Sequence, residues 1–231
     1  MSARTVPSAA SVLATLVRVT LLRLVRGRAV WVCLGIAFLP LVIASAFPGE
    51  RKILEILEVA EMFVLVVLPP VFVASSIGEE IEDRTTTYLW SRPIARWTII
   101  VGKLIALAPI ATVLVLAGWF VSVEAATSHP PSTDSLIAFG AGAVAVSVMS
   151  AGLGTLVPKQ GMVLAIVYLV IIDLAIGVIP ASLQNISITR QVVLLGGFDG
   201  QVSKATPAIT MAVIAGVWLA IGLLRLRRRE S

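Results

Sequence analysis

The residues most able to take part in chemistry gather in one polar stretch, residues 78–97, of an otherwise apolar chain. An acidic cluster is followed by an arginine, two candidate threonines, a tyrosine and two further arginines; the candidates are Glu79, Glu80, Glu82, Asp83, Arg84, Thr85, Thr86, Tyr88, Arg92 and Arg96. Acidic residues favour a helix N-terminus, where the macrodipole is positive, and Pro93 stops a helix. The pattern therefore predicts either a short charged helix that docks a soluble partner or a solvated loop anchored by interfacial aromatic residues.

The same stretch permits an enzymatic interpretation, which the rest of the sequence disfavours. Glu79, Glu80 and Arg84 match a Glu-Glu-x-x-x-Arg pattern that resembles the intramembrane CAAX-type proteases. That chemistry needs histidines beside the glutamates, and His129 is the single histidine of the chain. It lies in a proline-rich loop that we place on the opposite side of the membrane. With Cys33 as the only cysteine, a metal site built from cysteine and histidine is also not expected.

Three carboxylates fall in or near apolar segments, where an ionised group is costly and usually faces a partner or a cavity. Asp173 either lines a substrate path or dimer interface, or is a hydrogen-bonded residue that locks two helices together, and we favour the second interpretation. Glu58 and Glu61 either guard an exit for cargo or form a wet helix face. Lys103 is expected to extend its ammonium group to the cytoplasmic interface.

The composition indicates which elements must position these residues. Apolar residues make up 58% of the 231-residue chain, charged residues 13%, and the mean hydropathy is +1.00. A soluble domain is about half apolar and a quarter charged, so this chain has too little polar surface to cover a soluble globule. Because a bilayer core requires roughly 20 apolar residues per helix, six stretches predict spans at residues 29–47, 59–77, 98–123, 136–157, 162–179 and 207–224.

Shorter segments complete a single transmembrane domain over residues 1–231. Residues 8–28 alternate apolar side chains with arginines, which predicts an amphipathic interfacial helix; a longer, tilted first span is the alternative. Residues 50–61 read as a helical extension of the second span, and residues 181–206 as short helices on the outer membrane surface. Small residues at 140–143 and 151–154 favour close helix packing. The fold class is therefore all-α and polytopic.

The distribution of basic residues predicts the orientation, because cytoplasmic loops carry an excess of lysine and arginine. With six spans, fourteen basic residues fall on one side and four on the other. The larger set comprises Arg4, Arg18, Arg23, Arg26, Arg28, Arg84, Arg92, Arg96, Lys103, Lys159, Arg225, Arg227, Arg228 and Arg229; the smaller comprises Arg51, Lys52, Arg190 and Lys204. Both termini are therefore predicted to be cytoplasmic.

The polar stretch also resembles a known family. Glu80, Arg84-Thr85, Tyr88-Leu89, Ser91-Arg92-Pro93, Arg96 and Gly102-Lys103 look like the segment that bridges the second and third spans of ABC-2 type transporter permeases, the membrane subunits of type V-like ABC exporters. Arg84 departs from the family, since many members have glycine there. The resemblance implies that residues 78–97 contain the coupling helix that meets the ATPase subunit, and that Pro158 and Lys159 form a second, smaller contact.

The resemblance also implies a function and a set of partners. The chain lacks the Gly-x-x-x-x-Gly-Lys-Ser/Thr loop that cradles phosphates, so ATP and magnesium are expected on a separate ABC ATPase subunit and the chain itself is not expected to be an enzyme. The implied protein is a homodimeric exporter of a hydrophobic or amphipathic substrate in a bacterial cytoplasmic (inner) membrane. Some family members also contact an extracytoplasmic protein, and no nucleic acid is expected. The alternative is a non-transporting scaffold or sensor for a cytoplasmic partner.

Overall fold

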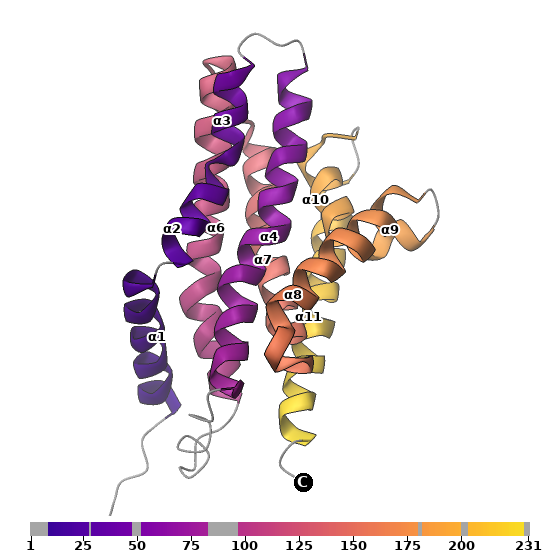
Figure 1. Cartoon of the computed structure of the whole chain (residues 1–231). Coiled ribbons are helices and arrows are strands. Elements are labelled where there is room, and N and C mark those ends of the chain that lie inside the picture. The colour runs from indigo at the N-terminus through magenta and orange to yellow at the C-terminus, as the bar shows by residue number, and fades with distance from the viewer. Residues whose placement is uncertain are drawn as a thin grey trace, which may run out of the picture.

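The computed structural model describes residues 9–27, 29–47, 52–82, 97–179, 182–199 and 203–228, and every regular element in these ranges is a helix (Figure 1). The elements, in chain order, are α1 (Ala9–Arg26), α2 (Ala29–Ala37), α3 (Leu39–Ala46), α4 (Ile53–Glu82), α6 (Trp97–Thr127), α7 (Thr133–Leu156), η1 (Pro158–Gln160), α8 (Gly161–Val167), the π-helix η2 (Tyr168–Asp173), α9 (Leu174–Val178), η3 (Ser182–Ile186), α10 (Ile188–Gly196) and α11 (Ala205–Arg228). The chain is therefore an all-α protein over its described residues.

Within the described ranges, five helical paths are long and apolar enough to cross a bilayer. They are α4, α6, α7, the run from α8 through η2 to α9, and α11. A sixth path is a bent pair in which α1 meets the α2–α3 segment at an angle of 75°. These lengths and compositions are those of a polytopic membrane protein.

The first predicted span, residues 29–47, is broken into two helices at Phe38. Pro40 has no N–H to donate to a carbonyl one turn earlier, and such a loss interrupts an α-helix. The amides of Leu41 and Val42 both donate to the carbonyl of Phe38, at 3.1 and 3.3 Å. The predicted span at residues 29–47 therefore consists of two helices, because the proline shifts the hydrogen-bond ladder.

Helix α7 lies at the centre of the bundle and packs against α4, α6, α8, α10 and α11. Glycines allow these close approaches. A Cβ on Gly152 would collide with the carbonyl oxygen of Trp218 on α11, and one on Gly154 would lie 3.3 Å from Ala74 of α4. A Cβ on Gly161, the first residue of α8, would lie 2.8 Å from Gly154. The small residues at 151–154 thus place α7 in direct contact with three neighbouring helices.

Helices α4 and α6 are the longest elements and extend past the width of a bilayer core. They contain 30 and 31 residues, and at 1.5 Å per residue each is about 45 Å long, against a core of about 30 Å. Figure 1 shows that the end of α4, the beginning of α6, η1 and the end of α11 lie at one end of the bundle. The loop between α6 and α7 lies at the opposite end, as do the end of α3 and the beginning of α4.

Candidate functional site

A pocket opens at the end of the bundle where α4, α6 and the α6–α7 loop converge. Its volume is about 510 Å³, within the range of about 300–1,000 Å³ typical of small-molecule sites. Its walls come from α4, α6, the loop, the first turn of α7 and the segment after α10; the lining residues are Leu54, Glu55, Glu58, Trp119, Val123, Thr127, His129, Pro130, Pro131, Ser132, Ser135 and Phe198.

Aromatic rings form one wall of this pocket. The ring centroid of Trp119 lies 4.8 Å from that of Phe139 and 6.2 Å from that of Phe198, and the two phenylalanine rings are 5.9 Å apart. Phe139 is fully buried behind the wall, whereas the other two rings line the pocket. The indole Nε1 of Trp119 donates to Ser135 Oγ at 3.0 Å, so the orientation of the indole is fixed.

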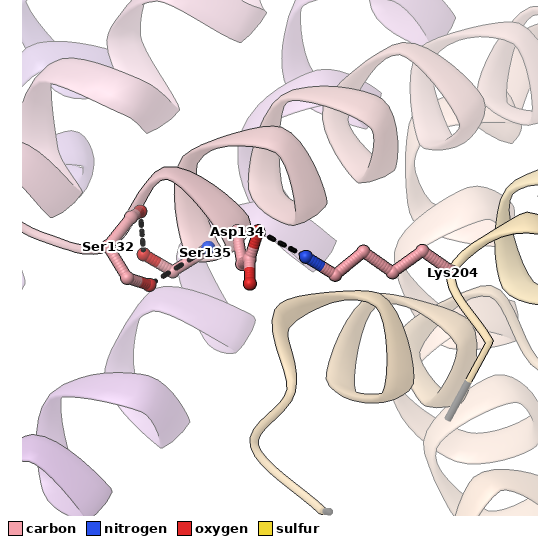
Figure 2. Close-up of polar contacts among 4 residues, drawn as sticks. All are labelled: Ser132, Asp134, Ser135 and Lys204. Carbon is pink, nitrogen blue, oxygen red and sulfur yellow. Dashed lines mark hydrogen bonds and ion pairs between the residues drawn. The ribbon is translucent and has the colours of Figure 1, made fainter. Parts of the chain in front are cut away.

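Polar contacts cap the beginning of α7 and link it to Lys204 (Figure 2). Ser132 is the N-cap of α7: its Oγ accepts from the amide of Ser135 at 3.2 Å, and its carbonyl accepts from Ser135 Oγ at 2.8 Å. Asp134, in the first turn, accepts from Lys204 Nζ at 2.6 Å. An acidic residue in the first turn also suits the helix dipole. Lys204 precedes α11, so this ion pair joins the beginnings of α7 and α11 at the rim.

Glu55, Glu58 and Glu61 follow one another on α4 at a spacing of three residues, which places them along one helix face. Glu55 lies at the surface and pairs with Lys52 at 3.8 Å, with both side chains 73% exposed. Glu58 is half-buried in the pocket wall, and it has neither a hydrogen bond nor an ion pair with any residue the structure describes. The charged groups that act on it, Glu55 and Asp199, are both negative.

Glu61 lies deeper in the bundle and outside the pocket lining. Its side chain is 0% exposed, and neither carboxyl oxygen has a hydrogen-bond partner among the residues that the structure describes. A Cβ on Gly118 would lie 3.7 Å from Glu61 Oε2 and would collide with the carbonyl oxygen of Ala37, the last residue of α2. Glu61 therefore lies between α4 and α6 near the break of the first span. Glu58 therefore lines an open pocket, whereas Glu61 is enclosed within the bundle.

His129 lines the pocket, at the end of the bundle opposite the end of α4 at Glu82 (Figure 1). The imidazole is therefore far from the Glu79–Glu80 backbone, at the other end of a helix about 45 Å long. Among the described residues, no group of three or more His, Cys, Asp or Glu side chains is arranged to hold a metal ion.

The acidic cluster of the polar stretch occupies the last turn of α4 rather than the first turn of a new helix. The helix is continuous from Ile53 to Glu82, so the backbone of Glu79, Glu80 and Glu82 is its C-terminal end. The expectation of a helix N-terminus here is wrong, because the apolar span continues into the acidic residues without a break. The side chains of these glutamates, together with Asp83, Arg84, Thr85, Thr86, Tyr88, Arg92 and Arg96, lie outside the described residues.

Pro158 and Lys159, the second predicted contact, lie in η1. This short 3₁₀-helix connects α7 to α8 and packs against α4. The side chain of Lys159 is exposed. Lys159 therefore belongs to a segment that packs against the helix that carries the acidic cluster.

Asp173 has a structural environment that supports the second of its two interpretations. It is 3% exposed, and its carboxylate accepts hydrogen bonds from the amides of Ile188 (2.9 Å) and Thr189 (3.0 Å) and from the hydroxyls of Thr189 (2.7 Å) and Ser187 (3.2 Å). A carboxylate at a helix N-terminus satisfies free N–H groups and complements the dipole. Asp173 therefore joins the end of the π-helix η2 to the beginning of α10.

Lys103 is buried between α6 and α4, and the expectation that it reaches the interface is wrong. Its side chain is 1% exposed, and its Nζ donates to the carbonyl of Ser76 on α4. Helix α1 covers the neighbouring surface, since a Cβ on Gly102 would lie 3.3 Å from Leu16. The packing of α4 and α1 on this part of α6 encloses the ammonium group.

Comparison with known proteins does not assign the chain to a family. No protein-family model matches the chain. No curated protein gives a significant match either. The function must therefore be argued from the arrangement of the residues described above.

Sequence reasoning identified Glu58 but missed the rest of the pocket. Trp119, Ser135 and Phe198 belong to three separate segments, and nothing in their local sequence indicates that they meet. The regular spacing of Glu55, Glu58 and Glu61 along one helix face was the one available signal.

Proposed function

We propose that the chain is the membrane-spanning permease subunit of an ABC exporter whose ATP is hydrolysed by a separate subunit. One observation carries the proposal: the two segments expected to contact the ATPase lie at the same end of the bundle. The acidic end of α4 and the exposed Lys159 of η1 belong to elements that pack against each other. A partner that docks on one segment can therefore reach the other.

The lengths of α4 and α6 support a docking surface outside the membrane. Each helix is about 15 Å longer than a bilayer core, so the polar turn at Glu79–Glu82 can project beyond the lipid. The connection at residues 83–96 joins these two helices, as the coupling segment does in the ABC-2 permeases that the sequence resembles. Movement of the partner would then act on two of the longest helices of the bundle.

The orientation and the membrane are part of this proposal. We place the end that carries η1 and the end of α11 in the cytoplasm, because the excess of lysine and arginine falls there. Six spans result when the bent pair formed by α1 and α2–α3 counts as one crossing. A bacterial cytoplasmic membrane is the location that the resemblance implies.

A second copy of the chain and a hydrophobic or amphipathic cargo complete the proposed assembly. Only 22% of the residues in the run from α8 to α9 are buried, and Val163, Val167 and Ile171 are among its exposed side chains. Such side chains suit contact with lipid or with another apolar surface. Two copies would give twelve spans around a central path, and an extracytoplasmic protein could contact the opposite end.

Purification of the chain with its native partners tests the proposal. We expect a P-loop ATPase to copurify, and we expect the triple variant Glu79→Lys/Glu80→Lys/Glu82→Lys to lose it while still entering the membrane fraction. The matched control is Glu55→Lys/Glu124→Lys, which reverses two exposed acids at the opposite end and should retain the ATPase.

Two results would contradict the proposal. One is an ATPase that copurifies equally with the triple variant and the control, which would remove the docking surface from the end of α4. The other is a soluble partner without a P-loop, which would favour the alternative of a membrane scaffold or sensor.

A further inference from the structure

The pocket between α4, α6 and α7 contains one carboxylate, Glu58, whose charge is balanced by none of the residues that the structure describes. Glu58 is half-buried there, without a hydrogen bond or ion pair to any described residue. The basic residues described at this end already have acidic partners: Lys52 pairs with Glu55, Arg190 with Asp199, and Lys204 with Asp134. The pocket therefore presents unbalanced negative charge to anything that enters it.

The walls around Glu58 are suited to a cation with an apolar body. The rings of Trp119 and Phe198 line the same cavity as the carboxylate, together with Leu54 and Val123. An aromatic face attracts a cation that lies within about 6 Å of the ring centroid, and desolvation strengthens this attraction. The hydrogen bond from Trp119 Nε1 to Ser135 Oγ holds the indole in place before a ligand arrives.

We propose that this pocket binds an organic cation with an aromatic or aliphatic body, with Glu58 as its counter-charge and Trp119 and Phe198 as its apolar wall. The volume of about 510 Å³ is large enough for a drug-sized ligand. The pocket lies at the end of the bundle opposite the proposed ATPase contact, which suits a cargo site. That role rests on the proposed export function. Binding itself requires no partner subunit.

Two probes of the same shape and opposite charge test the proposal on the full chain. Tetraphenylphosphonium and tetraphenylborate are titrated separately into the protein in phosphatidylcholine nanodiscs, and the heat from empty nanodiscs is subtracted. We expect saturable binding of the cation and none of the anion. Partition of the probes into lipid is the same for every variant and therefore cancels.

Three variants test whether the cation binds in the pocket. Glu58→Gln keeps the shape and removes the charge, and should weaken cation binding by about tenfold or more. Phe198→Leu keeps an apolar side chain and removes a ring, and should weaken it by about threefold. Glu124→Gln removes an exposed charge from the same end of α6, outside the pocket lining, and should bind within about twofold of the unchanged chain.

The proposal is overturned if Glu58→Gln binds the cation as tightly as the unchanged chain, or if the anion binds equally well. Thermal unfolding of each variant checks that lost binding does not reflect lost structure, and Phe198→Leu gives an independent reading should Glu58→Gln fold poorly. Because no ATPase is present in this experiment, its failure would leave the proposed coupling surface untouched. Absence of an ATPase partner would likewise leave the binding result standing.

Discussion

At the scale of single residues, two buried carboxylates differ in the number of hydrogen-bond donors around them. Asp173 accepts four hydrogen bonds from the first turn of α10, whereas Glu61 accepts none from any described residue. In the sequence both are acidic residues in apolar segments. The difference arises because the chain returns after α9 and brings a helix N-terminus to Asp173, while no such donors reach Glu61 from the described residues.

Replacement of Asp173 by Asn tests the link between η2 and α10. One carboxylate oxygen becomes an NH₂ group that faces the N–H donors of Ile188 and Thr189, so at least one hydrogen bond is lost and a donor is left buried. We expect a loss of about 1–3 kcal/mol in the free energy of unfolding, measured by thermal or denaturant unfolding in detergent. Asp134→Asn, at an ion pair with Lys204 in which both side chains are exposed, is the control and should cost less than about 1 kcal/mol. Equal effects of the two variants would contradict a special role for Asp173.

Replacement of Glu61 by Met should change the free energy of unfolding in the opposite direction to Asp173→Asn. An unpartnered buried carboxyl costs stability, whereas an unbranched apolar side chain of similar length fills the same space. We expect Glu61→Met to raise the free energy of unfolding by about 1–3 kcal/mol, while Glu124→Met, at an exposed position of α6, changes it by less than about 0.5 kcal/mol. A lower unfolding temperature for Glu61→Met would show that the carboxyl has a stabilising partner in the assembled protein.

At the scale of elements, glycines set the distance between α7 and α11. A Cβ on Gly152 would collide with the carbonyl of Trp218, whereas a Cβ on Gly216 of α11 would meet nothing within 4 Å. Gly152→Ala should therefore separate the two helices and cost about 1–3 kcal/mol. Gly216→Ala should stabilise by up to about 1 kcal/mol, because alanine favours the helix. Thermal unfolding of both variants in one detergent measures the contrast, and a stabilising Gly152→Ala would refute the close contact.

Much of the helical architecture could be predicted because each membrane span carries its own apolar composition. The length of α6, the position of α7 and the existence of a separate N-terminal helix follow from residues that are adjacent in the sequence. The break at Phe38 could not be placed, because Pro40 is tolerated inside some membrane helices and interrupts others, depending on its neighbours. The burial of Lys103 depends on α1 and α4 packing over α6, which no local pattern reveals.

The candidate site was less predictable than the fold, because it depends on tertiary packing that local sequence does not reveal. Glu58 stands out as a charge near an apolar span, but its aromatic wall comes from Trp119 on α6 and Phe198 after α10. Those residues are about 80 positions apart in the chain, so their meeting is a result of tertiary packing. The acidic turn at Glu79–Glu82 was assigned to the wrong end of a helix because composition alone does not show that α4 continues into it.

At the scale of the whole molecule, α4 joins the two proposed functional regions. Glu58 lies in the pocket near its beginning, and the acidic cluster forms its end, about 30–36 Å away along the helix. A rigid element that contacts both regions is a physical route by which an event at one could shift the population of states at the other. This arrangement requires the pocket and η1 to face opposite sides of the membrane, which can be tested directly.

Single cysteines at the two ends test this orientation. The native Cys33 is fully buried and should give little background with a membrane-impermeant maleimide. In intact cells we expect the reagent to label His129→Cys in the α6–α7 loop and to leave Lys159→Cys in η1 unlabelled; both should react after the cells are lysed, since both native side chains are exposed. Labelling of both sites in intact cells, or of Lys159→Cys alone, would invert or remove the proposed topology. The proposed ATPase contact would then not face the cytoplasm, and the proposed export mechanism, which requires an ATPase on that side, would be contradicted.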